Sequence, residues 1–284
     1  MAQQTRQILR RIENVSHVKQ ITKAMYAIAA TQVIQRKRAL RAARPFTDHS
    51  PRVLGELWAA ARAEGLSHPW FEPGEGEGNA LLVVNADRGL CGRYVGEVNR
   101  AAESLARASG RVKVLAGGEK ARAFFRNRGW EIAASYTHAY ERPDLAAARR
   151  ILADVLELFP SSVKEVHVVH MGFRGELVQK VEKTLLLPLQ PPPAAPGELV
   201  TEPALDDLLG TAAEVSLLGR LLWILLEAKA SEQAIRRQAM KTATDNADEL
   251  IDDLTLTYNK ARQHGITREL ADIVGGSEAL REAR

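Results

Sequence analysis

The residues best placed to carry chemistry follow the strand-like runs in the middle of the chain. After the apolar run at residues 80–85, residues 87–94 read DRGLCGRY. Backbone amides cradle phosphate groups where glycines recur as G-x-G-x-x-G or G-x-x-x-x-G-K-[ST], and neither spacing occurs here. Gly117 and Gly118, after the next strand-like run, form no such motif either. The sequence therefore favours turn-forming glycines over a nucleotide site.

Other reactive side chains lack suitable companions. Cys91 is the single cysteine, which excludes an internal disulfide and a CxxC pair and favours a packed thiol over a nucleophile. His167 and His170 lie three apart in a predicted strand, so their side chains point to opposite faces and cannot share a metal. The acids between 245 and 253 have the spacing of a solvated helix face. We therefore predict no catalytic residue, cofactor or metal.

The elements that position these loops predict an α/β domain. Helical patterns lie between strand-like runs; the runs are 80–85, 112–116, 132–136, 165–171 and 182–187, and the helical patterns are 91–109, 119–128 and 145–159. This alternation is typical of a largely parallel sheet with helices on both faces, a Rossmann-like three-layer domain. Only a short polar stretch around Gly175 separates the last two runs, which indicates an antiparallel edge hairpin.

The two ends of the chain have the pattern of long helices. Residues 1–44 and 220–264 contain neither Gly nor Pro, and apolar residues recur there every three or four positions. The first stripe is Ile8, Ile12, Val15, Val18, Ile21 or Thr22, Met25, Ile28 or Ala29, and Val33. The second is Ile235, Ala239, Ala243, Ala247, Leu250 or Ile251, Leu254, Tyr258 and Ala261. Helices of this length normally pair, so we predict a long antiparallel coiled coil of the N- and C-terminal helices.

Proline and glycine predict where these parts meet. Pro45 is expected to end the first helix, and a short amphipathic helix is expected at 52–64. Six of the twelve prolines fall between 188 and 203, which predicts a stiff linker. The predicted domains are therefore 1–64, the N-terminal coiled-coil helix with the short helix; 79–190, the Rossmann-like domain; 191–203, the Pro-rich linker; and 204–284, the C-terminal coiled-coil helix.

Charge is distributed unevenly between the two long helices. Residues 1–44 carry ten Lys and Arg and one acid, Glu13, which leaves +9, whereas residues 220–264 carry seven charges of each sign. This excess predicts an acidic partner, with a solvated helix face as the alternative. No run approaches 18 apolar residues, so no direct membrane span is expected. Arginines at 6, 10 and 11 interrupt any signal-peptide core, which favours a cytosolic chain or one attached to the cytosolic face of a membrane.

Short motifs in all parts of the chain resemble the gamma subunit of F-type ATP synthase. They are ITKAM at 21–25, GLCG at 89–92, ASEQA at 230–234, AMKTATDNA at 239–247, YNKARQ at 258–263 and ITREL at 266–270. The resemblance implies the central shaft of a rotary motor. The shaft would lie inside a ring of alpha and beta subunits and would be turned by a proton-driven c-ring. It also implies an epsilon subunit as a partner and a peripheral location on the cytoplasmic face of a bacterial cell membrane. Catalysis would belong to the beta subunits, so the resemblance implies that this chain is not itself an enzyme.

The resemblance also implies coupling contacts to the beta subunits. Met25 and Lys23 match the part of the N-terminal helix that meets an acidic lever loop, and Arg236 matches the neighbouring position on the C-terminal helix. Gln263 and Thr267 match positions that contact the beta subunits higher in the ring. The alternatives are seam packing for Met25 and, for Thr267, an N-cap after Gly265 that begins a last helix to residue 273. The lone Cys91 leaves no cysteine pair for thiol regulation.

Two further functional classes remain open from sequence. A nucleic-acid-binding coiled coil would explain the basic helix, but it would leave the sheet domain without an aromatic binding face; we predict no nucleic-acid partner. A Rossmann-type enzyme with a helical dimerisation arm would need a phosphate loop, which the sequence lacks.

Overall fold

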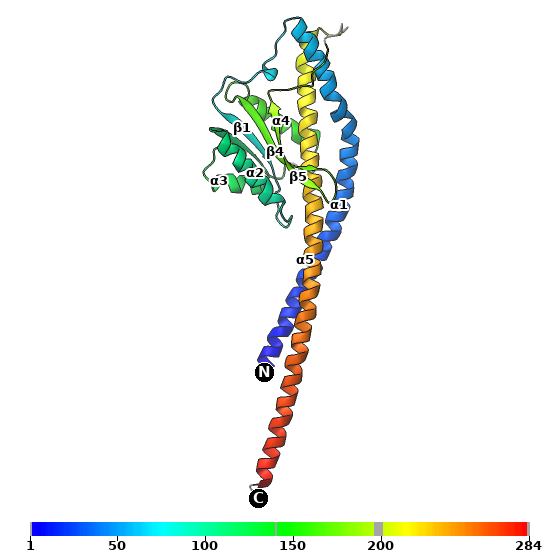
Figure 1. Cartoon of the computed structure of the whole chain (residues 1–284), viewed down its shortest axis with the longest axis vertical. Coiled ribbons are helices and arrows are strands. Elements are labelled where there is room, and N and C mark those ends of the chain that lie inside the picture. The colour runs from blue at the N-terminus through cyan, green and yellow to red at the C-terminus, as the bar shows by residue number, and fades with distance from the viewer. Residues whose placement is uncertain (1, 140, 196–200, 283–284) are drawn as a thin grey trace. The chain divides into compact units, whose positions relative to one another are not determined.

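The computed structural model describes residues 2–139, 141–195 and 201–282, and it divides into two compact units. Met1–Ile28 and Arg237–Arg284 form the coiled-coil unit, and Ala29–Arg236 form the central unit. Two long helices, α1 (Ala2–Ala63) and α5 (Leu205–Glu282), contribute to both (Figure 1). The predicted α/β fold, with long N- and C-terminal helices and a Rossmann-like domain, is confirmed.

The central unit is built on a five-stranded sheet in the order β3-β2-β1-β4-β5. Its strands are β1 (Asn79–Val84), β2 (Val112–Gly117), β3 (Ile132–Tyr136), β4 (Glu165–Phe173) and β5 (Gln179–Leu187). The first four strands are parallel, and β5 pairs antiparallel with β4. The order reverses beside β1, where β2 lies on one side and β4 on the other, as in doubly wound folds. The edge hairpin predicted around Gly175 is therefore present.

Alternating residues of the strands supply two apolar layers. Leu81 and Val83 of β1 face α2 (Tyr94–Ala108) and α3 (Glu119–Arg126), which lie on the same side of the sheet in Figure 1. Leu82 and Val84 face the opposite way, toward α4 (Leu145–Leu158) and the first half of α5. The sheet is therefore covered on both faces, which explains why β1 reads as a continuous apolar run.

The first half of α5 belongs to the core of the central unit. Leu209, Leu217, Leu221 and Leu225 are buried in one cluster with α4, the sheet and the end of α1. By length and composition alone, α5 is also apolar enough to cross a membrane. The same test is passed by core helices, and these leucines are packed inside the unit.

The predicted break at Pro45 is wrong, because α1 continues through both Pro45 and Pro51 to Ala63. A proline inside a helix costs about 3 kcal/mol. Packing on both sides of the prolines offsets that cost: Leu40 before them and Leu54 and Leu57 after them are buried. Each such side chain contributes about 1.5–3 kcal/mol when fully buried. Tertiary packing thus overrides the local signal, and no separate helix begins near residue 52.

The coiled-coil unit pairs the start of α1 with the second half of α5. Thr22 is hydrogen-bonded to Thr244 (2.9 Å), and Lys19 forms an ion pair with Asp248. Residue numbers rise on one helix as they fall on the other, so the helices are antiparallel. The structure also resolves the alternatives in the stripes: Thr22, Ala29 and Ile251 are buried or half-buried, while Ile21, Ile28 and Leu250 are exposed. Val18 is also exposed, contrary to the predicted stripe; the half-buried residue there is Lys19.

Two further expectations concern Thr267 within α5 and the segment that precedes α5. The predicted N-cap role of Thr267 is wrong, since α5 runs unbroken through Gly265, and the Thr267 hydroxyl donates to the carbonyl of Gln263 (3.0 Å) within the helix. Residues 196–200 of the predicted Pro-rich linker lie outside the described residues, and residues 191–195 form no helix or strand.

His68 gives the central unit a testable pH dependence. Its Nδ1 accepts a hydrogen bond from the amide of Trp70 (3.2 Å) and caps the short 3-10 helix Pro69–Phe71. Burial lowers the pKa of His68, although nearby Asp206 opposes that effect. Below the ordinary histidine pKa of about 6.5, the unfolded chain therefore binds a proton more readily than the native chain does.

We expect stability to fall as pH drops from 7.5 to 5.5, and His68→Asn, which retains a capping oxygen, to reduce that fall. Urea unfolding at both pH values measures it. His17→Asn, a change at an exposed position of the coiled-coil unit, serves as the control. An equal loss of stability in the wild type and in His68→Asn would contradict this role.

Candidate functional site

The C-terminal edge of the parallel strands is where open α/β sheets normally bind ligands. Here that edge is bonded to the protein itself. The Tyr94 hydroxyl donates to the carbonyl of Ala228 (3.2 Å), and Arg236 donates to the carbonyl of Gly89 (3.3 Å). Helix α5 therefore contacts the loop between β1 and α2, the segment in which a nucleotide motif was sought.

Amide groups that could bind a phosphate at this edge are used by Asp87. This buried carboxylate accepts from the amide of Glu119, at the start of α3, and from the amide of His138, both at 3.0 Å. Asn85 is held similarly, donating to Asn99 (2.7 Å). An anion at the start of α3 would compete with Asp87, so the geometry agrees with the absence of a phosphate motif in the sequence.

A buried ionic cluster joins α5 to this edge. The Glu232 carboxylate, 2% exposed, accepts from Lys229 (3.0 Å) and Arg236 (2.6 Å). Arg36 of α1 donates to the carbonyl of Glu141 (3.1 Å). Burial lowers the pKa of Arg36, and the charge of Glu232 partly counteracts this. Charged groups this deeply buried are stable only when paired, so the cluster requires its members to stay together.

Two groups of side chains have the donor chemistry of a metal site. His170, Glu182 and Glu227 converge beneath α5, and Asp87, His138 and Glu141 converge at the ends of β1 and β3. In the first group Glu227 pairs with His170 (3.3 Å), and Glu182 pairs with Arg174 (2.6 Å). Each carboxylate therefore already has a cationic or imidazole partner.

Sequence reasoning found part of this arrangement. His167 and His170 do lie on opposite faces of β4: His170 pairs with Glu227 of α5, and His167 pairs with Glu165 (2.8 Å). The contact of His170 with Glu227 was not predicted, because residues 57 apart in sequence carry no periodic signal. Cys91 is buried, and burial raises the pKa of its thiol. This agrees with a packed thiol, since the thiolate is the reactive form.

Four of the five predicted contact residues lie in the coiled-coil unit. Lys23, Gln263 and Thr267 are exposed, and Met25 is half-buried. Arg236 lies in the central unit and is 9% exposed, with its guanidinium directed at Glu232 and Gly89. Its internal bonds hold α5 against the sheet, and its predicted contact with a beta subunit stays a prediction.

The basic charges of α1 are less available than their number suggests. Lys19 pairs with Asp248, Lys37 with Glu176 (2.5 Å), and Arg36 with the Glu141 carbonyl. Among the residues that the structure describes, Lys23 has no such partner. Lys23 is therefore the clearest free cation beside Met25.

Comparisons with known proteins match nearly the whole chain to one family. The family model described as ATP synthase matches residues 4–280. The ATP synthase gamma chain of Desulforamulus reducens is 38% identical over 280 residues, which cover 97% of this chain and 98% of that relative. The chain belongs to the ATP synthase gamma chain family. The gamma chain of Halothermothrix orenii is 36% identical over 284 residues and covers similar shares, 97% and 99%.

Solved structures show the same fold as this member of the gamma chain family. The rotor of Euglena gracilis mitochondrial ATP synthase, in rotational state 1, matches with a TM-score of 0.65 over 94% of this chain and 100% of that chain. The central stalk and c-ring structure from Tetrahymena thermophila gives a TM-score of 0.63 over 78% and 99%. At 16% and 21% sequence identity, these likenesses establish the fold.

Some of the sequence motifs that resemble the gamma chain family make contacts between distant parts of the chain. Thr22 of ITKAM is hydrogen-bonded to Thr244 of AMKTATDNA in the coiled-coil unit. In the central unit the carbonyl of Gly89, in GLCG, accepts from Arg236, which follows ASEQA by two residues. These motifs thus mark places where the two long helices meet each other and where α5 meets the loop after β1.

Because the Glu232 carboxylate pairs with two buried cations, we predict that its neutralisation lowers the stability of the chain strongly. Replacing Glu232 by Gln removes the charge that pairs Lys229 and Arg236 and leaves two buried cations without a counterion. We expect the free energy of unfolding to fall by about 3 kcal/mol, the lower end of the range for breaking a buried pair. Urea unfolding of the full chain measures it.

Glu214→Gln, an exposed change on the same helix, is the matched control for Glu232→Gln. It should alter stability by no more than about 0.5 kcal/mol. If the two variants lost equal stability, the buried cluster would not be holding α5 on the sheet.

Proposed function

We propose that the chain is the central-stalk rotor subunit of a proton-translocating F-type ATP synthase. In this role it couples proton-driven rotation to conformational cycling of the catalytic beta subunits. Membership of the gamma chain family over nearly the whole chain carries the proposal. The subunit itself is non-catalytic, and the assembled complex is the H⁺-transporting ATP synthase.

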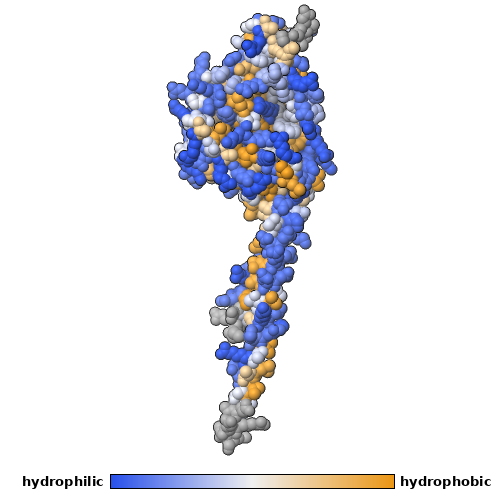
Figure 2. Space-filling view, in the orientation of Figure 1, coloured by the Kyte–Doolittle hydropathy of each residue, from blue (hydrophilic) through white to orange (hydrophobic). Residues whose placement is uncertain are grey.

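The surface of the coiled-coil unit supports a large protein partner. Val18, Ile21 and Ile28 of α1 are each more than half exposed, and so are Leu270, Ile273 and Val274 of α5. Figure 2 shows apolar patches along the two-helix region, interspersed with hydrophilic surface. Exposed apolar residues gathered in this way mark interaction sites, and a surrounding ring of subunits would cover several sides of the helices together.

The end of α5 extends past the start of α1. Thr5 and Leu9 lie opposite the segment Ala261–Ile266. Within the described residues, the later turns of α5 therefore lie past the start of α1. Figure 1 shows α5 continuing beyond the N-terminal end of α1. Because an isolated helix is marginal in water, a partner that encloses this end would stabilise it. The alpha and beta subunits of the F1 ring fit this requirement.

The remaining partners follow from the same assignment. The epsilon subunit and the c-ring of the membrane sector would bind elsewhere on the chain. The complex is membrane-associated, and we place this subunit peripherally at the cytoplasmic face of a bacterial cell membrane. Coupling would consist of differential contact between the rotating chain and the successive states of three beta subunits.

Native mass spectrometry of the complex retained by a tag on this chain tests the assembly. After mild detergent extraction of membranes, we expect one copy of this 31.2 kDa chain with a ring of two larger, alternating ATPase subunits. An untagged strain controls for adventitious binding. Recovery of the chain alone, or with nucleic acid, would overturn the proposal and favour the nucleic-acid-binding alternative.

Met25→Lys tests coupling at the coiled-coil unit. An added cation beside Lys23 would bind an acidic lever loop too tightly, so we expect less ATP-driven proton pumping per ATP hydrolysed. Pumping into membrane vesicles and ATP hydrolysis are measured on the same preparation. Gln20→Lys adds the same charge at an exposed neighbouring position and serves as the control. An unchanged coupling ratio in Met25→Lys would exclude Met25 as a contact.

A further inference from the structure

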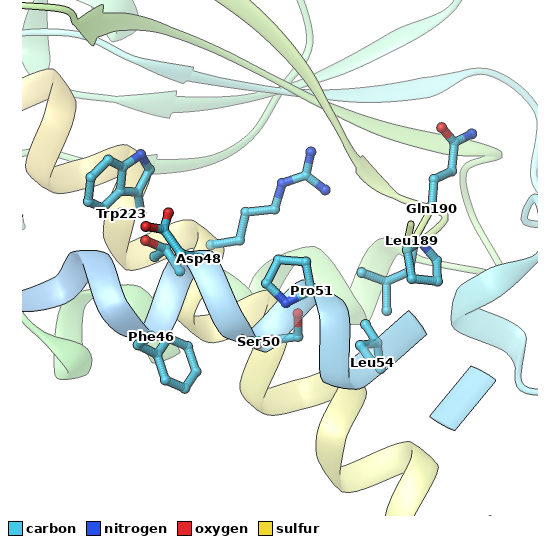
Figure 3. A pocket seen from close by; sticks show the side chains of 12 residues that line it. Phe46, Asp48, Ser50, Pro51, Leu54, Leu189, Gln190 and Trp223 are labelled. Carbon is cyan, nitrogen blue, oxygen red and sulfur yellow. The ribbon is translucent and has the colours of Figure 1, made fainter. Parts of the chain in front are cut away.

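Three segments of the central unit line a partly open cavity of about 380 Å³. It is lined by residues 46–54 of α1, by residues 189–191 after β5 and by Ser216, Arg220 and Trp223 of α5. Figure 3 shows Trp223 and Asp48 near one end, Leu54 and Leu189 near the other, and Pro51 between them. A volume of this size falls in the range of small-molecule sites. Its lining residues all belong to the central unit and lie outside the loop between β1 and α2.

The cavity contains a cation without a counterion. Arg220 is half-buried, and burial lowers the pKa of its guanidinium. Among the described parts of the chain, no carboxylate lies within ion-pair distance of Arg220. Asp48 also lines the cavity, but its side chain is 62% exposed and pairs with Arg44 (3.4 Å). A partly desolvated arginine is most stable when an anion accepts from its planar fork of donors.

The walls around Arg220 are mainly apolar and aromatic. Phe46 can pack against α5 because Gly219 has no side chain; a Cβ there would lie 2.0 Å from Cε1 of Phe46. Trp223, one turn after Gly219, supplies a second aromatic ring, and Leu54, Pro51 and Leu189 supply aliphatic surface. Ser50, Ser216 and Gln190 add hydrogen-bonding groups. An occupant must therefore combine one anionic group with an apolar body.

We propose that this cavity binds a small aromatic carboxylate, whose carboxylate pairs with Arg220 and whose ring system packs against Trp223, Pro51 and Leu189. A dry cavity of about 150 Å³ holds one benzene molecule, so this cavity accommodates about 15 non-hydrogen atoms. A carboxylate matches the two parallel donors of one guanidinium and neutralises it with a single charge. The inference is independent of the rotor assignment, since it concerns only the central unit.

Naphthalene-2-carboxylate is a suitable probe, because it carries one carboxylate on a fused aromatic body. Its binding to the full chain is measured by isothermal titration calorimetry, beside the neutral isostere naphthalene-2-carboxamide. We expect the carboxylate to bind about ten-fold more tightly than the carboxamide. In Arg220→Gln this preference should disappear, with both compounds binding at the weaker level. Arg100→Gln, an exposed change on α2, should retain the preference.

Ser50→Phe provides a second test with Arg220 intact. The larger side chain fills the cavity, so both compounds should lose binding. Thermal unfolding verifies that each variant is folded. Absence of carboxylate binding to the wild type, an equal affinity for the carboxamide, or an unchanged preference in Arg220→Gln would each overturn the proposal.

Discussion

Glu232 accepts from Lys229 and Arg236 at a point where α5 leaves the apolar core of the central unit. Leucines of the first half of α5 cover one face of the sheet. Beyond them, buried charged residues follow on the same helix, and one of these, Arg236, contacts the loop after β1. The sheet edge that other α/β folds use for ligands is thereby bonded to α5. This contact fixes which side of α5 faces the sheet within the central unit.

The net charge of residues 1–44 overstates how many of its cations are free to face a partner, because several are paired within the chain. The excess of +9 in residues 1–44 suggests a uniformly basic surface. Several of these cations have partners within the chain: Lys19 contacts Asp248, and Lys37 contacts Glu176. Surface pairs of this kind contribute little to stability, but they reduce the number of cations that face a partner. The free charge is therefore concentrated at fewer positions, of which Lys23 is one.

Periodic patterns predicted most of the fold, because strands and helices that bury one face repeat their apolar residues regularly. They predicted the five strands and the antiparallel hairpin, and they found the pairing of the long helices. They failed at Pro45 and Gly265, where burial or helix continuity overrides a local signal that normally ends a helix. They could not predict the contact of His170 with Glu227 or the cavity around Arg220. Both features depend on residues brought together from distant parts of the sequence.

The hydrogen bond between Thr22 and Thr244 lies in a seam that is otherwise formed largely by apolar residues. Two hydroxyls can satisfy each other at only one axial offset of the helices. A slide of one turn, about 5.4 Å, would break this contact and leave each hydroxyl only a carbonyl of its own helix, that of Lys19 for Thr22 and that of Met240 for Thr244. A polar pair in such a seam fixes register at some cost in stability. Lengthwise shear is thereby opposed, so a load applied along one helix of the coiled-coil unit is shared by the other.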